Sequence, residues 1–327
     1  MIKPRLRAHL TGLALLLAQA LAMPAVWAQA YPNKPIRMLV GYSPGGAADA
    51  GVRPLAKALE GQLGQPVVID YRPGSAGGVA MEFMARTPAD GYTLYFFDSG
   101  PLTVAPHLNK VGYQPFNSFT QLGHVCGNGS MLAVNAATPF KSVAEVIAAA
   151  KAEPTKWSYG TSGIAGPHHL SGELFKSVTG AGLVHIPYKG GGPAMTDLMG
   201  GQVPMLFTSL APAVAAVKSG RVRALGVTSL KRSAAFPEVP TFDELGLKGF
   251  DSSAWFGVLG PAGLPPEVAS RLTAALQAAG QDKALIEQIS ATGCDAEVLS
   301  PALTVDKIRA DSAKWGKVIK DAGIKAE

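Results

Sequence analysis

The stretch that decides the fold is residues 36–49, which read IRMLVGYSPGGAAD. Its apolar start, Ile36–Val40, lies between Pro35 and Gly41 and is typical of a buried parallel strand. A glycine-rich turn follows, and apolar residues then recur at helical spacing up to Leu59, which predicts a helix. Such a helix start leaves backbone N–H groups unpaired at the positive end of the helix dipole. The stretch therefore predicts an anion-binding turn, and its glycine spacing fits neither a dinucleotide-binding motif nor a P-loop.

The same strand–turn–helix unit recurs in the next part of the chain. Residues 66–70 are expected to form a second buried strand, and residues 71–78 are another glycine-rich loop before a helix at 79–86. A third strand, 92–97, ends at residues 98–100, which read DSG. Three such units in succession predict a parallel sheet covered by helices. Right-handed crossovers bring the loops to one edge of the sheet, where open α/β sheets bind ligands.

A second series of units follows residues 101–119, which are rich in proline and asparagine. Residues 123–134 are predicted to be a long, interrupted strand that crosses into a second lobe. The opening architecture then repeats as a strand at 157–160, a loop at 161–169 and a helix at Pro167–Thr179. Further strands are expected at 184–188, 203–207 and 222–228, and further helices at Val143–Ala152, 194–200 and 212–218.

The last part of the chain returns to the first lobe. Residues 252–260 are an apolar strand that crosses back, and amphipathic helices are expected at 264–279, 284–292 and Pro301–Asp321, the last two joined through residues 294–299. We therefore predict an α/β protein whose two lobes, joined by two crossing strands, form a hinged cleft that closes around a ligand. The first lobe is expected to comprise residues 29–126 with 256–327, and the second lobe residues 127–255.

The first 28 residues have the features of an export signal. Lys3, Arg5 and Arg7 precede an apolar core at 10–23, which is shorter than the roughly 20 residues that a membrane anchor needs. We expect cleavage near Ala28, where small residues stand at the required positions. Removing the three basic residues lowers the formal charge from +6 to +3. No cluster of basic residues interleaved with aromatics appears, so we expect no nucleic-acid partner.

Cysteines and histidines give no sign of a metal centre. Cys126 and Cys294 are the two cysteines, and their separation is compatible with a disulfide and equally with two unpaired, buried thiols. His168 and His169 are adjacent, so on a helix their side chains point about 100° apart. Because no third ligand is spaced nearby, we expect neither a metal nor a cofactor.

Ten short motifs, taken in order, resemble one receptor family. They are YPNKPI at 31–36, PGG with Asp49 at 44–49, GQPVV at 64–68, RPGSAGG at 72–78, DGYTL at 90–94, HLSGELF at 169–175, VHIPYKGG at 184–191, GQV at 201–203, RALGVTS at 223–229 and WFG at 255–257. The mature chain is identified by them as a member of the tripartite tricarboxylate transporter receptors, periplasmic solute-binding proteins also called Bug proteins. The resemblance implies a Venus-flytrap fold and capture of a small organic carboxylate for delivery to membrane transporter subunits.

The resemblance also implies where the ligand binds. In such receptors, one strand-to-helix loop from each lobe holds a carboxylate through backbone N–H groups, hydroxyls and ordered waters. Those loops correspond here to residues 42–49 and 161–168. Hydroxyl residues at other predicted strand ends are further candidates for ligand contact, which follow from the sequence pattern and not from the resemblance. The expected ligand-binding residues are Tyr42, Ser43, Gly45, Gly46, Ala47, Asp49, Ser75, Ser99, Thr161, Ser162, Gly163, Ile164, His168, Thr208 and Ser209.

Several of these residues have a structural interpretation beside the functional one. Because an acid repels a carboxylate, Asp49 is interpreted as an organiser of its loop at the helix N-terminus. Each hydroxyl at a strand end is equally compatible with a solvated loop. His168 is a candidate donor to an anion at the helix start, whereas His185 is interpreted as structural. Trp255 is expected in the core, as is Phe256. Arg72 is expected to stabilise its loop, with a bidentate carboxylate contact as the alternative.

The chain departs from the family pattern at three places, which bear on the ligand. Ser43 adds a hydroxyl beside the first loop, and Ile164 and His168 replace residues that are usually polar or small. After the strand at 203–207, Thr208 and Ser209 stand where the family often has Asp-Asn. The missing acid disfavours a ligand with a cationic amino group and favours a plain mono- or dicarboxylate.

Three functional hypotheses follow from the sequence. The first is a periplasmic, monomeric receptor that performs no chemistry. The second, an exported hydrolase with a Ser/His pair, is disfavoured because residues 160–163 lack the Gly-x-Ser-x-Gly elbow. The third is a sensor subunit that binds the same carboxylate and feeds a signalling protein, which begins with the same binding and closure.

Overall fold

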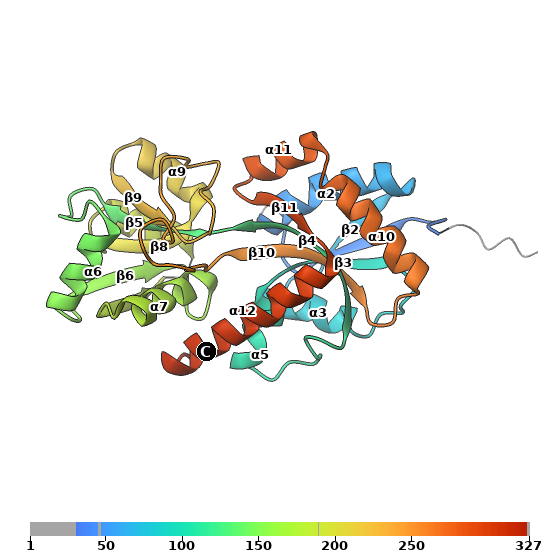
Figure 1. The fold of residues 1–327 in the computed structure, drawn as a ribbon, viewed down its shortest axis with the longest axis horizontal. Helices are drawn as coiled ribbons and strands as arrows, with labels where there is room; N and C mark the ends of the chain where they lie inside the picture. Colours follow the sequence, from blue (N-terminus) through green and yellow to red (C-terminus); the bar gives the residue numbers. More distant parts are fainter. Residues whose placement is uncertain (1–30, 45–46, 189, 326–327) are drawn as a thin grey trace, which may run out of the picture. The chain divides into compact units, whose positions relative to one another are not determined.

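Two mixed sheets organise the chain (Figure 1). The computed structural model describes residues 31–44, 47–188 and 190–325. Residues 34–327 form one unit, which holds all the helices and strands given below. The predicted export signal lies outside the described residues, as do Gly45 and Gly46 of the first predicted binding loop.

The first sheet, with the strand order β11-β4-β10-β3-β1-β2, is the centre of the first lobe. Strands β1, β2 and β3 are parallel, β10 runs antiparallel to β3 and β4, and β11 runs antiparallel to β4. The strands are β1 (Ile36–Val40), β2 (Val67–Tyr71), β3 (Thr93–Asp98), β4 (Phe119–Asn128), β10 (Ala254–Pro261) and β11 (Asp295–Leu299). The helices and short turns of this lobe are α2 (Ala47–Leu63), η1 (Ser75–Gly77), α3 (Gly78–Met84), α4 (Gly100–Thr103), α5 (Ala105–Leu108), α10 (Pro266–Ala279), α11 (Lys283–Ala291) and α12 (Pro301–Asp321).

The second sheet, with the strand order β7-β6-β8-β5-β9, is the centre of the second lobe. Strands β6, β7 and β8 are parallel, and β5 runs antiparallel to β8 and β9. The strands are β5 (Ser130–Asn135), β6 (Trp157–Thr161), β7 (Leu183–Pro187), β8 (Met205–Ser209) and β9 (Val222–Val227), and the helices are α6 (Val143–Ala152), α7 (Pro167–Thr179), α8 (Gly191–Met199) and α9 (Leu210–Lys218). The predicted α/β fold with two lobes is therefore confirmed, whereas the residue boundaries of the lobes stay a prediction.

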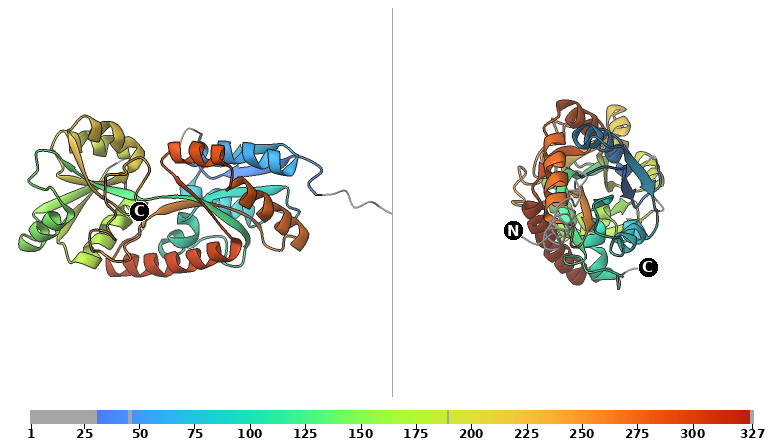
Figure 2. Two further views of the ribbon diagram at one scale, coloured as in Figure 1. Left: turned by 45° about the horizontal axis from the view of Figure 1, so that its top comes forward. Right: turned by 90° about the vertical axis from the view of Figure 1, so that its right-hand side faces the viewer.

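The chain passes between the two sheets where β4 leads into β5 with Gly129 between them, and again where β10 joins the first sheet (Figures 1 and 2). The pairing of β4 with β10 begins at Asn128 opposite Ala254 and continues to the far end of both strands. Cys126 of β4 forms a disulfide with Cys294, which precedes β11. The structure thus decides between the two states of the cysteines that the sequence left open, and the result suits an oxidising compartment.

Helix α12 connects the first lobe to the second. Its residues Trp315, Val318 and Ile319 pack against Leu170 of α7 in a small apolar cluster. Nearer the first sheet, Asp311 of α12 accepts a hydrogen bond from the indole N–H of Trp255 at 2.8 Å. These contacts explain why Trp255 is fully buried, as the sequence predicted for a core residue of the crossing strand.

Two strands at the edges of the first sheet differ from the prediction. β2 is an edge strand rather than a buried one, and Val68 is 55% exposed. The segment at 294–299, which was expected only to join two helices, contains β11, and β11 pairs with β4 at the opposite edge. The stretch rich in proline and asparagine that follows β3 contains the short helices α4 and α5, which were not predicted. Edge strands have one unpaired side and mixed burial, so an apolar run does not show how deeply they are buried.

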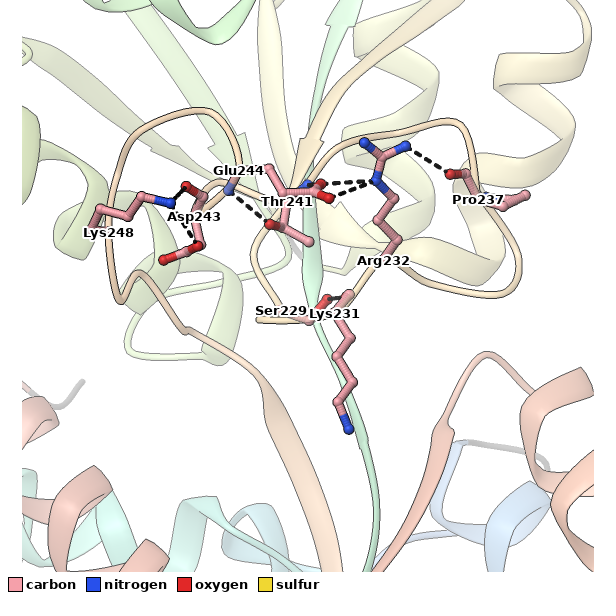
Figure 3. A network of polar contacts seen from close by, with 8 residues as sticks. All are labelled: Ser229, Lys231, Arg232, Pro237, Thr241, Asp243, Glu244 and Lys248. Carbon is pink, nitrogen blue, oxygen red and sulfur yellow. Dashed lines mark hydrogen bonds and ion pairs between the residues drawn. The ribbon is translucent and has the colours of Figure 1, made fainter.

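The connection between β9 and β10 is long and has little regular structure, yet it is tied down internally (Figure 3). Phe236, Phe242 and Phe250 are buried beneath it. On its outer side Arg232 forms an ion pair with Glu244, which also accepts a hydrogen bond from the backbone N–H of Thr241 at 2.8 Å (Figure 3). This loop closes over the edge of the second sheet without adding a strand to it. No helix within residues 31–44, 47–188 and 190–325 has both the length and the apolar character needed to cross a membrane.

Candidate functional site

The ends of three parallel strands form the first half of the site. β3, β1 and β2 are neighbours in that order, so their carboxyl ends lie side by side. They deliver Tyr42 after β1, the loop at 72–78 after β2, and Asp98 with Ser99 at the end of β3. This is the edge that the sequence predicted for ligand binding in an open α/β sheet.

The loop at 72–78 has an unusual backbone and packs tightly against β1. Ser75 and Ala76 both have a φ of 48°, in the left-handed region that residues with side chains seldom adopt. A Cβ atom on Gly41 would lie 2.6 Å from the Cα atom of Gly77, so the end of β1 and this loop meet backbone to backbone. Strain of this kind is held only where the surroundings fix it, and it is concentrated at functional sites.

Tyr42 and Asp98 form the polar centre of this first half. The Tyr42 hydroxyl contacts the Asp98 carboxyl, and it also lies 3.0 Å from the carbonyl oxygen of Ala76. Asp98 accepts a second hydrogen bond from the backbone N–H of Gly100 at 2.7 Å. Burial raises the pKa of Asp98 to about 6, and it raises the pKa of Tyr42 well above its usual range, with the charge of Asp98 adding to the effect.

Asp49 is held by its own lobe. It lies in the first turn of α2, and its side chain accepts a hydrogen bond from the Tyr71 hydroxyl and forms an ion pair with Arg53 at 2.8 Å. These contacts connect α2 to the end of β2 and agree with the interpretation of Asp49 as an organiser of the loop. Arg72 likewise bonds Asp70 at 3.1 Å and covers the ring of Phe83, which fits its structural interpretation.

The second half of the site is a histidine between two serines. Ser162 follows β6, Ser209 ends β8, and β6 and β8 are neighbours in the second sheet. His168, in the first turn of α7, bridges them, with Nδ1 2.8 Å from the Ser162 hydroxyl and Nε2 3.0 Å from the Ser209 hydroxyl. Burial lowers the pKa of His168 to about 4, so the ring is neutral at neutral pH.

A neutral imidazole has one N–H donor and one acceptor nitrogen. Of the two serines beside His168, one therefore donates its proton to the ring, and the other accepts from the ring and keeps its proton free. Both ring nitrogens are occupied, so in this structure His168 orients hydroxyls and does not offer an N–H to an anion, the role suggested by the sequence.

Thr161 is used to build the loop. It is 1% exposed, and its hydroxyl donates to the carbonyl oxygen of Gly163 at 2.9 Å. The same oxygen lies 2.7 Å from Nε2 of His185, which must then be the donor. His185 stacks on His169, whose Nδ1 accepts from the backbone N–H of Ala165. His185 is thus hydrogen-bonded within the fold, and burial lowers its pKa to about 4.

A cavity of about 820 Å³ joins parts of the two halves. From the first lobe it is lined by Tyr42, Ser75 and Ser99, and from the second by residues 164–167 at the start of α7. It extends along α5 to the contact of α7 with α12, where apolar side chains dominate the wall. The charged residues that line it are Glu82, Asp98 and Lys110.

Comparison with known proteins identifies the family of this chain. A family model described as tripartite tricarboxylate transporter family receptor matches residues 52–324. The protein BugT of Bordetella pertussis (strain Tohama I) is 35% identical over 92% of this chain and 93% of its own length. The chain belongs to the tripartite tricarboxylate transporter receptor family. The resemblance inferred from the motifs is therefore confirmed.

Solved structures agree with this assignment. The periplasmic binding protein BugD is 32% identical with a TM-score of 0.72, over 91% of this chain and 100% of that one. A protein of R. palustris solved with adipate is 32% identical with a TM-score of 0.75, over 90% of this chain and 99% of that one. The family is one of periplasmic solute receptors and not of enzymes.

Within this receptor, the structure brings together only part of the predicted set. Tyr42, Ser75, Ser99 and Ile164 line the cavity. Ser162, His168 and Ser209 form one bonded group and are not among the residues that line the cavity, and Ser43 and Ala47, the latter the first residue of α2, are exposed. Thr161, Gly163 and Asp49 support the loops, and Thr208 is buried within β8. Direct ligand contacts for all of them stay predictions.

Sequence reasoning missed Asp98 and Glu82, two acids on the cavity wall. Asp98 directly precedes Ser99, so its place at the end of a predicted parallel strand was a usable signal. Glu82 lies inside α3, and nothing in the local pattern shows that this helix faces the cavity. Within the described residues, no three His, Cys, Asp or Glu side chains are grouped to hold a metal ion.

Proposed function

We propose that this receptor is exported to the periplasm, binds a small organic carboxylate between its lobes and delivers it to a tripartite tricarboxylate-type transporter. The observation that carries the proposal is the cavity lined by strand-end loops of both lobes and by the start of α7. The solved relative with adipate, at 32% identity, supports a carboxylate as the ligand class.

The donors around the cavity suit an anion. Helices α2 and α7 begin directly after strand-end loops, so their unpaired N–H groups and positive dipole ends face the same edge as the ligand loops. His168 leaves one of two serine hydroxyls with a free proton on the second lobe. Neutral donors of this kind hold a carboxylate without the cost of desolvating a cation.

A thermal-shift screen of residues 29–327 tests the proposal. We expect the melting temperature to rise with at least one of benzoate, adipate, citrate and glutamate, because a ligand at about 100 times its Kd stabilises by about 2.7 kcal/mol. The matched controls are the primary amides of the same acids, which lack the charge and should give no shift. A shift with the amides as large as with the acids would contradict carboxylate recognition.

One observation speaks for the hydrolase alternative, namely the hydrogen bond between Ser162 and His168. The other ring nitrogen of His168 bonds Ser209 rather than a carboxylate, so the orienting third member of a triad is missing. A pKa lowered to about 4 also makes this imidazole a poor base at neutral pH. Hydrolysis of nitrophenyl esters at a rate that His168→Gln abolishes would favour the enzyme over the receptor.

A further inference from the structure

The cavity of a proposed carboxylate receptor carries an acid that forms no ion pair with a cation of the described residues. Asp98 lies on its wall beside Tyr42, and within the described residues no lysine or arginine forms an ion pair with it. An ionised carboxyl in such a place costs desolvation free energy and repels a second negative charge brought near it. The Asp98 carboxyl therefore either needs a hydrogen-bond donor or a cation as its partner, or it determines which ligands can bind in the cavity.

The protein itself satisfies Asp98 only in part. A carboxylate has about four lone-pair positions, and two of these are used by Tyr42 and by the backbone N–H of Gly100. Tyr42 has one proton, and the carbonyl oxygen of Ala76 at 3.0 Å competes for it. At least two acceptor positions of Asp98 thus remain for a donor that enters the cavity.

Besides Tyr42, the described titratable groups close to Asp98 are two tyrosines and a second acid. Tyr95 of β3 donates its proton to the carbonyl oxygen of Gly77 at 3.1 Å, and Tyr113 donates to that of Pro101 at 2.6 Å. Glu82 of α3 is a second acid on the same cavity wall, and Lys110 is the one cation among the described lining residues. This part of the cavity consequently accepts hydrogen bonds more readily than it donates them.

We propose that Asp98 is a specificity-determining residue, which selects carboxylates whose far end carries a hydroxyl or ammonium donor and disfavours a second ionised carboxylate there. The inference rests on the proposed carboxylate-binding function and names the ligand class of the same site. It also changes the expectation from the sequence that a ligand with a cationic amino group is disfavoured. The acid that is missing after β8 in the second lobe is replaced by Asp98 in the first lobe.

The test is isothermal titration calorimetry with ligands that differ only at the far end. One set is 6-aminohexanoate, 6-hydroxyhexanoate, hexanoate and adipate, and a shorter set is 4-aminobutyrate, 4-hydroxybutyrate, butyrate and succinate. In the wild type, the amino and hydroxy members of at least one set should bind about tenfold more tightly than the dicarboxylate. Asp98→Asn, which keeps the shape and removes the charge, should reduce that ratio about tenfold or more.

Two further variants keep the test sharp. Asp98→Ser is the second variant in case the asparagine disturbs folding, and Glu82→Gln is the matched control that removes the other acid of the same wall. Lowering the pH from about 7.5 to about 6 should shift the wild-type ratio toward the dicarboxylate by more than it shifts the Asp98→Asn ratio, since any titration of the ligand is common to both proteins.

The outcomes separate this inference from the function on which it rests. Carboxylate binding with a ratio that is the same within about twofold in wild type and Asp98→Asn would overturn the inference and leave the receptor function standing. A preference for the dicarboxylate in the wild type would overturn it as well. Failure of every carboxylate in both sets and in the thermal-shift screen would overturn the proposed function, and this inference with it.

Discussion

The two groups of strand ends share a topology and differ in chemistry. In each lobe, three neighbouring parallel strands end at one edge, and a helix begins directly after one of them. The first lobe places an acid and tyrosines there, with the pKa of Asp98 raised to about 6 by burial. The second lobe places histidines and hydroxyls there, with the pKa of His168 lowered to about 4, also by burial. Burial thus favours the neutral form on both sides of the site.

This difference teaches that the fold supplies the position of a site and the side chains supply its selectivity. The second lobe offers neutral donors, which suit the head of any carboxylate. The first lobe offers an acid that a dicarboxylate would have to approach. A receptor built this way uses one lobe for the class of ligand and the other to choose within the class.

The largest effect is expected where backbone meets backbone. Alanine at Gly41 would place its Cβ 2.6 Å from the Cα of Gly77, and neither chain segment can yield without moving β1 or the loop at 72–78. We expect Gly41→Ala to lower the free energy of unfolding by about 3 kcal/mol in urea titrations.

Gly160 is the matched position in the second lobe. A Cβ there would meet the ends of the Leu206 and Tyr188 side chains, which can rotate away. Gly160→Ala should therefore cost about 1 kcal/mol. Equal losses for the two variants would mean that the two strand ends are equally tolerant and that the close packing at Gly41 carries no special constraint.

The regular parts of this fold could be predicted from the sequence, because periodicity reports burial directly. Helices Val143–Ala152, Pro167–Thr179 and Pro301–Asp321 occur at their expected bounds. Their apolar spacing agrees with clear end signals, such as Ser142, whose hydroxyl accepts from the backbone N–H of Glu145 at the start of α6. Strand β2 occurs close to its expected position but at an edge rather than buried, and β11 was not predicted as a strand.

The site was predictable only as far as single loops determine it. The strand-to-helix loops were found, because glycine and a following helical pattern are local signals. The bridge from Ser162 through His168 to Ser209 joins two loops 47 residues apart in the chain (209 minus 162), and no local pattern shows that they meet. The position of Asp98 at a strand end was visible in the sequence, but its contact with Tyr42, which follows a different strand, was not.

The opposite pKa shifts of the two lobes predict opposite contributions to stability as the pH changes. The folded protein keeps a proton on Asp98 up to about pH 6, whereas the unfolded chain releases it near pH 4. This contribution is present at about pH 4 and is lost as the pH rises through about 6. The folded protein keeps His168 neutral down to about pH 4, whereas the unfolded chain takes up a proton below about pH 6.5. That contribution is present above about pH 6.5 and is lost as the pH falls toward 4.

Urea titrations between about pH 4 and pH 6.5 can separate the two contributions. Asp98→Asn should make stability rise more steeply with pH, and His168→Gln should make it rise less steeply, each by at most about 2 kcal/mol over the interval because both residues are partly exposed. If the free energy of unfolding changes with pH as steeply in both variants as in the wild type, then neither group has a different pKa in the folded and unfolded states.

The smallest effect concerns the two serines that His168 bridges. Because a neutral ring has a single N–H, only the serine that accepts from it keeps a proton for the ligand. Ser162→Ala and Ser209→Ala should therefore weaken carboxylate binding unequally: about tenfold for the serine that donates to the ligand, and about twofold or less for the one that donates to the ring. Calorimetry with the carboxylate found in the screen measures both, and Ser158→Ala, within the same strand β6, is the control for a general loss of hydroxyls. Equal weakening would mean that the His168 ring changes tautomer when the ligand binds, so that either serine can donate to the ligand. The second lobe would then adapt to its ligand, whereas Asp98 in the first lobe selects it.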